Sequence, residues 1–512
     1  MMTSVDAAPG NSRLDRVTRP FSLPRLIPWL ALAAIFAVAI LLRQWIPLNT
    51  DVSWLLVVGE RVLDGQRLYR DIVEINPPMA VLAYLPGIVL ARAIGVDPRH
   101  VIDAEILLLA ALSLFLTSRI LRRSPFANDL GWPLLIWSAA VLTIMPLQVF
   151  GQREHIATLT LLPSLALWAL RWDKQAPRAW AILVAGFGAG ITLAFKPFFA
   201  VPIALCVIVA TVATRRWRVL LAPDNVIAVT LVAGFSVWTY LAYPDYFSLT
   251  YPIVRDSYLS WSMPLSVIFI NPATMIGLIA AISVCLARQR RPLNPATWIT
   301  LVASAGFAVS FYLQRRGWSY HSFPMVSLAL LAMGQALTLP RTPLARGGVI
   351  AAFAVLAMTF LVGCQWFYAN VDIGPVEAAV SGLKRHPKIL VLSGEAAIGH
   401  PLVRNIYGTW VSRQENLWIR EFVRLTREDH AVDPATDARL KDYLALERRW
   451  LIEDFRNTPP DIVLIDNLRD QWGDWARADA EITDLLKPYR LVTTVRGIDV
   501  LSRVESAPRP PG

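Results

Sequence analysis

NTDVSWLLVVGERVLDGQRLYRDIVEINPP, residues 49–78, is the stretch that decides the fold. It closely follows an apolar run, Leu26 to Leu42, that is long enough to enter a bilayer. Asp51 lies about one turn beyond the expected membrane exit, and Glu74 precedes a Pro pair that restarts the apolar pattern. Because ionisable groups at a membrane boundary cost free energy unless they have a partner or a function, this stretch predicts a site at one face of a membrane protein.

The composition indicates a chain that crosses the membrane many times. Of its 512 residues, 55% are hydrophobic and 17% are charged, whereas soluble domains carry about 25% charged residues. The formal net charge of +11 does not indicate a nucleic-acid partner, because most arginines lie in short loops between apolar runs, where they orient a membrane protein. The three cysteines fall inside apolar segments, so neither a disulfide framework nor a thiolate metal site is expected.

Eleven segments are apolar and long enough to be predicted as membrane spans. A further apolar segment, 78–95, is interrupted at Pro86-Gly87. If 78–95 lies on the outer surface as an interfacial helix, the basic loops after the later spans all face the cytoplasm, as the positive-inside tendency requires. The prediction is therefore a polytopic all-α membrane protein with outer juxtamembrane helices and a cytoplasmic N-terminus. The predicted spans are 25–46, 101–119, 130–149, 154–171, 179–195, 198–213, 224–242, 265–286, 296–313, 323–339 and 347–367.

The spans divide the chain into three predicted parts. Residues 1–24 form a cytoplasmic tail without a signal-peptidase site, residues 25–368 form the transmembrane domain, and residues 47–100 are its first outer loop. Residues 369–512 have a soluble-like composition and are predicted as a small extracytoplasmic α/β domain. Its strands are expected at 388–392, 461–466, 489–496 and 498–504, and its helices at 414–424 and 437–456.

The predicted outer loops collect acids, bases and polar aromatic residues, whereas the predicted inner loops offer little but Arg. Asp51 is placed to act as a general base that takes a proton from an acceptor. It also suits the N-cap of the helix that begins near Val52. Glu74 is a candidate for fixing an acceptor or a cation, and its simpler interpretation is a solvated loop acid. The pattern predicts that chemistry takes place on the outer side.

The run QREH, residues 152–155, opens a predicted span at the same face. Glu154 and His155 are candidates for an acceptor or cation site, and Arg153 is a candidate for neutralising a phosphate. The simpler interpretation is a mutually paired helix cap. A divalent cation is left open as a cofactor, with four candidate ligands: Glu74, Glu154, His155 and His321.

Three cations are candidates for binding the phosphate of a donor. Lys196 precedes a helix-restarting Pro between two spans, and its simpler interpretation is a snorkelling side chain. Arg315 and Arg316 open a cluster of aromatic and basic residues that also suits an interfacial anchor. Candidate contacts to a sugar or lipid are Tyr69, Asn76, Trp318, Tyr320 and His321.

On these residues, the chain resembles the GT-C glycosyltransferases, the multi-spanning class that uses polyprenyl-phosphate sugars. The nearest branches are the bacterial protein mannosyltransferase-like and lipid A aminoarabinose transferase-like proteins. The resemblance rests on Asp51, on GERVLDGQRLYRDIVEINPP running into the interfacial helix, on Phe195-Lys196-Pro197 and on GWSYH at 317–321. It covers about residues 25–330.

The resemblance implies an inverting glycosyltransferase of the bacterial inner membrane, with a periplasmic C-terminal domain. It would move a sugar from a polyprenyl-phosphate donor to a lipid, glycan or protein acceptor, with membrane lipids as its surroundings. Asp51 matches the first-loop catalytic aspartate of the family, and Glu74 matches a second carboxylate before the Pro pair. The chain departs from protein mannosyltransferases at Val52, where those proteins commonly carry Glu next to the aspartate.

The alternative is a transporter or flippase for a lipid-linked or anionic solute. Such proteins usually hold polar groups near the middle of the bilayer, often in repeated halves. This chain keeps its ionisable groups at one face and shows no internal repeat. The sequence therefore favours the transferase.

Overall fold

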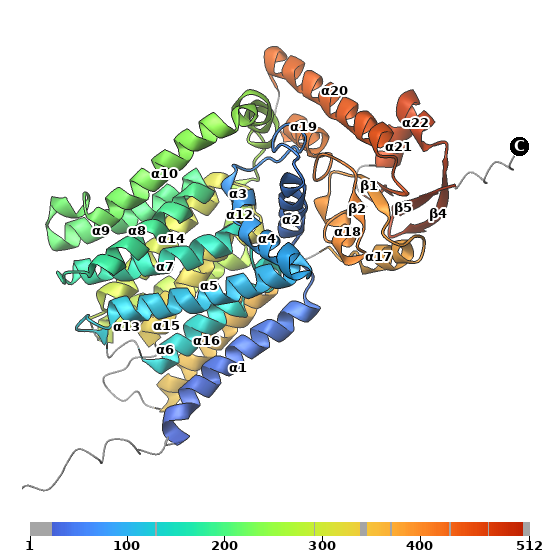
Figure 1. Cartoon of the computed structure of the whole chain (residues 1–512). Helices are drawn as coiled ribbons and strands as arrows, with labels where there is room; N and C mark the ends of the chain where they lie inside the picture. The colour runs from blue at the N-terminus through green and yellow to red at the C-terminus, as the bar shows by residue number, and fades with distance from the viewer. Residues whose placement is uncertain are drawn as a thin grey trace, which may run out of the picture.

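The computed structural model describes residues 23–127, 131–290, 292–337, 346–368, 371–429, 432–468 and 471–504. The tail predicted at 1–24 therefore lies almost entirely outside the described residues. In the described part, a bundle of long helices stands beside a small C-terminal domain that contains a β-sheet (Figure 1). This arrangement confirms the predicted fold class.

Each predicted span overlaps a helix of the bundle, and seven helices of the described chain are long and apolar enough to cross a membrane. Among the rest, α6, α8 and α15 are shorter, and α7 begins with three polar residues. The bundle helices are α1 (Leu23–Trp45), α5 (Pro98–Leu121), α6 (Trp132–Thr143), α7 (Arg153–Trp172), α8 (Ala179–Phe195), α9 (Ala200–Thr214), α10 (Pro223–Ala242), α13 (Pro272–Arg290), α14 (Pro295–Gln314), α15 (Phe323–Leu337) and α16 (Arg346–Phe367).

Two spans differ from their predicted bounds because turn-forming residues interrupt them. Helix α6 ends at Thr143, and the chain continues through Pro146 into a short 3-10 turn, which shortens the span predicted at 130–149. Helix α13 begins at Pro272, because the Asn271 side chain accepts a hydrogen bond from the Thr274 N–H at 2.9 Å. The segment 78–95 forms two pieces, α3 (Met79–Leu82) and α4 (Leu85–Ile94), and neither is long enough to span alone.

Glycine allows two bundle helices to approach closely. A Cβ atom added to Gly188 in α8 would lie 2.2 Å from the Thr160 carbonyl oxygen of α7, which is backbone and unable to move aside cheaply. The absent side chain therefore sets the distance between α7 and α8.

We expect Gly188→Ala to destabilise the protein by about 1–3 kcal/mol, the usual cost of overpacking a close-packed interior. Gly234→Ala in α10 is the matched control, because an added Cβ there meets no atom within 4 Å. Thermal unfolding of both variants in detergent measures the difference. An unchanged melting temperature for Gly188→Ala would contradict the close approach.

The C-terminal domain is built on one mixed sheet in the order β2-β1-β3-β5-β4. Strand β1 runs parallel to β2 and β3, and β5 runs antiparallel to β3 and β4. The four predicted strands are confirmed, whereas the two-residue edge strand β2 was not predicted. Arg496 and Gly497 both have positive φ, as the two-residue turn between β4 and β5 requires. The strands are β1 (Lys388–Leu392), β2 (Thr409–Trp410), β3 (Ile462–Asp466), β4 (Tyr489–Val495) and β5 (Ile498–Arg503).

Helices cover both faces of this sheet. Leu390 and Leu392 pack with apolar side chains of α20, α21 and α22 on one face, while Ile389 and Val391 share a cluster with α17 and α18 on the other. The central strands are therefore buried on both sides, which explains their continuous apolar sequence. The helices are α17 (Gly374–Ser381), α18 (Leu402–Asn405), α19 (Trp418–Asp429), α20 (Pro434–Asn457), α21 (Trp472–Ala478) and α22 (Ala480–Leu486).

Residues 47–100, predicted as the first outer loop, lie between the bundle and the C-terminal domain (Figure 1). Helix α2 (Thr50–Leu63) of this loop stands next to α18 and the sheet in Figure 1. Arg404 of the domain forms a bidentate pair with Glu60, at 3.2 and 2.8 Å. The Val73 N–H donates to the Arg413 carbonyl at 2.8 Å. These contacts place the carboxylates of the first loop beneath the domain.

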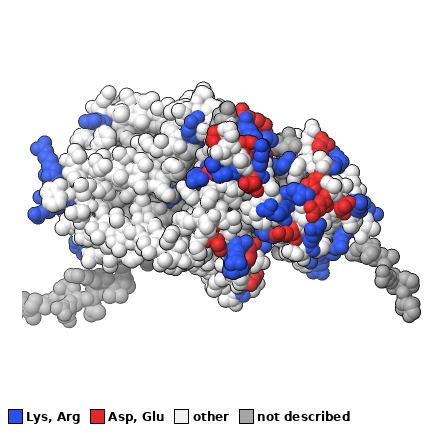
Figure 2. All heavy atoms as spheres, turned by 90° about the horizontal axis from the view of Figure 1, so that it is seen from above, with Lys and Arg blue, Asp and Glu red and all other residues white. Residues whose placement is uncertain are grey.

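Charged side chains are distributed unevenly along the length of the molecule. Figure 2 shows Lys and Arg mixed with Asp and Glu over the C-terminal domain and the adjoining end of the bundle. Most of the bundle surface in that view is uncharged, and its far end shows Lys and Arg only. An uncharged belt with cations at one end is the pattern expected of a membrane domain.

Candidate active site

Asp51 lies in the first turn of α2 and is not the cap of that helix. The cap is Asn49, whose side-chain oxygen accepts a hydrogen bond from the Val52 N–H at 3.3 Å. The Gln152 side chain also donates to this oxygen, which links the start of α2 to the start of α7. Because Asn49 caps the helix, the Asp51 carboxylate is left available, with 28% of its side chain exposed.

Arg153, the first residue of α7, holds two segments of the first loop together. Its Nη2 lies 3.0 Å from the Asp51 Oδ2, and its Nη1 donates to the Asn76 side-chain oxygen. Only 3% of the Arg153 side chain is exposed. Its observed partners are thus a carboxylate and an amide, and its guanidinium fixes the orientation of Asp51.

Glu74 is fully buried and accepts hydrogen bonds on both oxygens. The Trp54 Nε1 donates to its Oε2 at 2.5 Å, and the Asn76 backbone N–H and Nδ2 donate to its Oε1 at 2.8 and 2.5 Å. Burial raises the pKa of Glu74 above its ordinary value, while the hydrogen bonds from Asn76 oppose that shift. Glu74 is therefore a buried, hydrogen-bonded carboxyl group and not a solvated loop acid.

Tyr69 supports the same loop. Its φ of 69° lies in the left-handed region, which a bulky residue rarely adopts. Its ring is completely buried, and its hydroxyl donates to the Asn76 carbonyl at 2.6 Å. Such local strain persists only where surrounding contacts impose it. In this structure Tyr69 and Asn76 thus position Glu74 and Arg153.

Asp51, Arg153 and Glu74 belong to one cluster of charged side chains, and a second cluster surrounds Lys196. Lys196 follows α8 in an extended conformation. The Lys196 ammonium forms an ion pair with Glu154, which has no exposed side-chain surface. It also lies 2.9 Å from His321 Nε2 and 5.7 Å from the centre of the Tyr320 ring. Burial lowers the pKa of Lys196, and burial together with the Lys196 charge lowers the pKa of His321 well below its ordinary value. Both shifts disfavour the charged forms, and the close Lys196 cation in particular favours a neutral imidazole at His321.

The other predicted phosphate-binding residues contact the loop before α13. The Arg316 guanidinium donates to the Trp261 carbonyl and lies 4.3 Å from the centre of the Tyr258 ring. The Arg315 Nε donates to the Met263 carbonyl at 3.1 Å. Within the described residues, no hydrogen bond or ion pair joins either arginine to Asp51 or Lys196, and their roles remain predictions. Trp318, a predicted sugar or lipid contact, is 38% exposed.

The candidate cation ligands are spread over both clusters. Both ring nitrogens of His155 already contact the backbone, since Nδ1 accepts from the Gly151 N–H at 3.1 Å and Nε2 lies 2.8 Å from the Leu142 carbonyl. The described chain contains no group of three or more His, Cys, Asp and Glu side chains suited to a metal. In this arrangement Lys196 supplies the positive charge beside Glu154 and His321. The divalent cation remains an untested prediction.

Glu415 of the C-terminal domain joins the site, although no sequence pattern pointed to it. Val73 pairs in parallel with Gln414, which brings the next residues of each segment, Glu74 and Glu415, close enough to interact electrostatically. The Glu415 Oε1 is buried and has no hydrogen-bond partner. Burial and the negative charges of Asp51 and Glu74 raise the pKa of Glu415 well above its ordinary value. The C-terminal domain thus places a buried carboxyl group near Asp51 and Glu74.

We expect Glu415→Gln to raise the melting temperature at pH 8 and to leave it nearly unchanged at pH 4.5. The folded protein holds a proton on Glu415 that the unfolded chain releases near pH 4.5, the ordinary value for this group. The contribution of Glu415 to stability therefore falls as the pH rises from there through the folded-state pKa. Glu428→Gln, at a side chain that is 59% exposed, is the control. A melting temperature that shifts equally at both pH values would contradict this effect.

Comparisons with known proteins support the fold but identify no donor, acceptor or site residue of this chain. No protein-family model matches the chain, and no curated protein matches it. The crystal structure of ArnT from Cupriavidus metallidurans in the apo state is similar, with a TM-score of 0.59 and 13% identity, covering 95% of this chain and 100% of that one. The structure of the same protein bound to undecaprenyl phosphate gives a TM-score of 0.59 and 14% identity over the same coverage. The chain therefore has the same fold as ArnT, and its two clusters of charged groups lie at the end of the bundle next to the C-terminal domain.

Proposed function

We propose that the protein is an inverting glycosyltransferase that moves a sugar from a polyprenyl-phosphate donor to a lipid, glycan or protein acceptor. The observation that carries this proposal is that the two clusters meet at adjacent residues, Arg153 and Glu154, at the start of α7. Asp51 pairs with Arg153, and Lys196 pairs with the next residue, Glu154. A carboxylate and a buried ammonium therefore occupy one site, in a fold that in ArnT binds undecaprenyl phosphate.

Lys196 is proposed to bind the donor phosphate and to stabilise the charge that develops on it. Glu154 and His321 hold the ammonium in place, so little reorganisation is needed when the phosphate arrives. In a water-poor site, a fixed cation acts more strongly on a developing anion than it does in water. The Tyr320 ring, 5.7 Å from the ammonium, forms one wall beside the phosphate.

Asp51 is proposed to act as the general base. The acceptor hydroxyl or amine attacks the anomeric carbon from the face opposite the phosphate, and its proton passes to the Asp51 carboxylate. The bond between the anomeric carbon and the phosphate oxygen breaks, and the polyprenyl phosphate leaves with both bonding electrons. Arg153 keeps the carboxylate pointed at the acceptor, while Glu74 and Glu415 are proposed to line the acceptor side.

The proposed location is the bacterial inner membrane, with the site at its outer face. The N-terminus would be cytoplasmic and the C-terminal domain periplasmic. The concentration of Arg in the loops predicted to be inner supports this orientation. Cysteine-accessibility reporters placed near Asp71 and near Arg216 should then label from opposite sides of the membrane.

Reconstituted proteoliposomes test the function directly. The purified protein is supplied with a radiolabelled undecaprenyl-phosphate sugar and an envelope lipid extract as the acceptor source. Transfer of the label to a new product, with release of undecaprenyl phosphate, supports the proposal. Movement of intact donor across the bilayer without a new product would support the transporter alternative and contradict it.

A further inference from the structure

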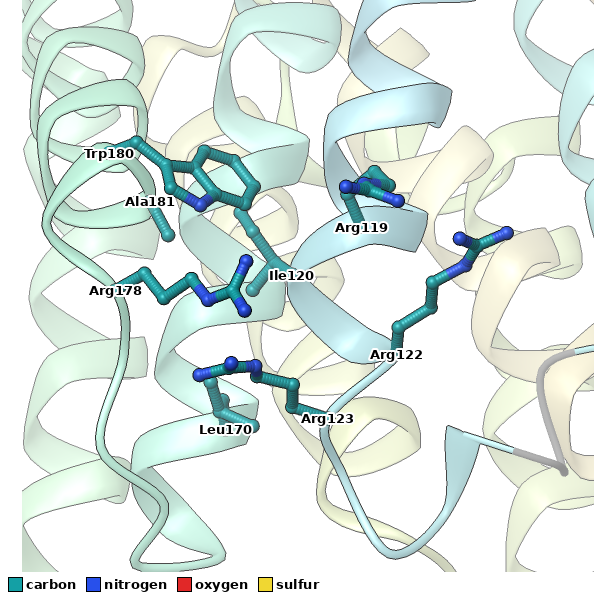
Figure 3. Close-up of a pocket in the computed structure, with 8 residues that line it drawn as sticks. All are labelled: Arg119, Ile120, Arg122, Arg123, Leu170, Arg178, Trp180 and Ala181. Carbon is teal, nitrogen blue, oxygen red and sulfur yellow. The ribbon is translucent and has the colours of Figure 1, made fainter.

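A group of arginines lies at the end of the bundle opposite the candidate active site. Four of them, at the end of α5 and just before α8, line a cleft of about 190 Å³. Figure 3 shows Arg123 and Arg178 reaching into the space between the two helices from opposite sides, with Trp180 beside them. The arginine cleft is lined by Arg119, Arg122, Arg123 and Arg178.

No carboxylate of the described chain forms an ion pair with any of these four arginines. The neighbouring Arg171, by contrast, pairs with the buried Asp224 of α10. Orienting a membrane protein requires cations at this face, but it does not require four of them to line one cleft. Cations that gather without counter-charge favour an anion between them.

A larger apolar groove adjoins the arginine cleft. Its volume is about 580 Å³, within the range of about 300–1,000 Å³ that is usual for sites of small amphiphilic molecules. Arg119 and Arg122 line both spaces, so the cationic and apolar parts are continuous. The groove walls come from α1, α5, α6, α7, α14 and α15. Together the two spaces complement a lipid. The cationic cleft matches an anionic head group, and the apolar groove matches an acyl chain.

We propose that the arginine cleft and the groove bind one anionic phospholipid from the membrane leaflet at this end. The phosphate lies in the cleft between Arg123 and Arg178, with Arg119 and Arg122 at its border with the groove, and the planar forks of guanidinium groups suit phosphate oxygens. One acyl chain enters the groove past Leu114 and Leu135. A free phosphate would leave the groove unfilled, and a zwitterionic lipid would bring a cationic head to an already cationic cleft.

The bound lipid would fasten α1 to the bundle. Trp29, Leu32 and Phe36 of α1 line the groove, and Trp29 contacts Trp132 of α6 edge to face, with ring centres 4.6 Å apart. Few other side chains of α1 are buried within the protein. Because a ligand that binds only the folded protein stabilises it, occupancy should raise the melting temperature.

The test compares two double variants that lose the same charge from the same end. Arg119→Gln with Arg122→Gln alters the arginine cleft, whereas Arg216→Gln with Arg218→Gln alters a loop that does not line it. Each protein is titrated in detergent with phosphatidylglycerol, with phosphatidylcholine of the same chains and with inorganic phosphate. Native mass spectrometry counts bound lipid, and thermal unfolding measures stabilisation.

We expect one phosphatidylglycerol per protein, with binding weakened at least about tenfold in the Arg119/Arg122 variant and unchanged in the Arg216/Arg218 variant. Ser138→Trp, which fills the groove without changing any charge, should weaken lipid binding as well. This variant keeps the test valid if the arginine variant fails to fold. Equal loss in both arginine variants, equal binding of phosphatidylcholine, or full stabilisation by inorganic phosphate would each overturn the proposal. Sugar transfer is not measured, so failure here leaves the proposed function untouched.

Discussion

Asp51→Asn is expected to lower the rate of sugar transfer by about 10²–10⁴-fold, the usual contribution of a general base. Asn keeps the shape of the side chain and still accepts a hydrogen bond from Arg153, which lies 3.0 Å from the carboxylate. The fold should therefore persist while the proton acceptor is lost. Initial rates in proteoliposomes at saturating donor measure the effect.

Asp71→Asn is the matched control for Asp51. Asp71 belongs to the same loop, but its side chain is 39% exposed and pairs only with Arg67, at 3.3 Å. An exposed pair of this kind contributes little to stability, and the variant should retain nearly full activity. If Asp51→Asn kept more than half of the wild-type rate in well-folded protein, Asp51 would not be the base.

Lys196→Gln is expected to have a similarly large effect on transfer, of about 10²–10³-fold, because it removes the fixed cation beside the donor phosphate. It should also destabilise the protein by about 3–5 kcal/mol, since the completely buried Glu154 loses its ion-pair partner. The two effects are separable by a second substitution. Transfer assays and thermal unfolding, run on the same preparations, measure them.

The double variant with Lys196→Gln and Glu154→Gln should recover most of the stability and none of the activity. The second Gln removes the unpaired carboxylate but cannot restore a cation for the phosphate. An active double variant would show that Lys196 serves only to neutralise Glu154. That result would leave the donor phosphate without its proposed ligand.

Part of the candidate site was predictable because its charged residues differ clearly from their apolar neighbours in the sequence. Asp51, Glu74 and Lys196 interrupt or border apolar runs, and a charge at a membrane boundary is visible in the sequence without any knowledge of packing. The strands of the C-terminal domain were predictable for a similar reason, since β1 and β3 are short apolar runs bounded by turn residues. The bounds of α6 and α13 were missed because Pro146 and Asn271 end or restart helices inside continuous apolar runs.

The sequence by itself determined the order of the apolar helices, the mixed composition of the last domain and the end of the bundle that carries the acids. Only the tertiary structure decided which charges pair. It joined Arg153 to Asp51 and Glu154 to Lys196, and it set Glu415 beside Glu74. The physical reason is the separation along the chain of the residues that interact. Helix and strand periodicity arises between neighbours along the chain, whereas an ion pair depends on how separate elements pack, and no local pattern records that.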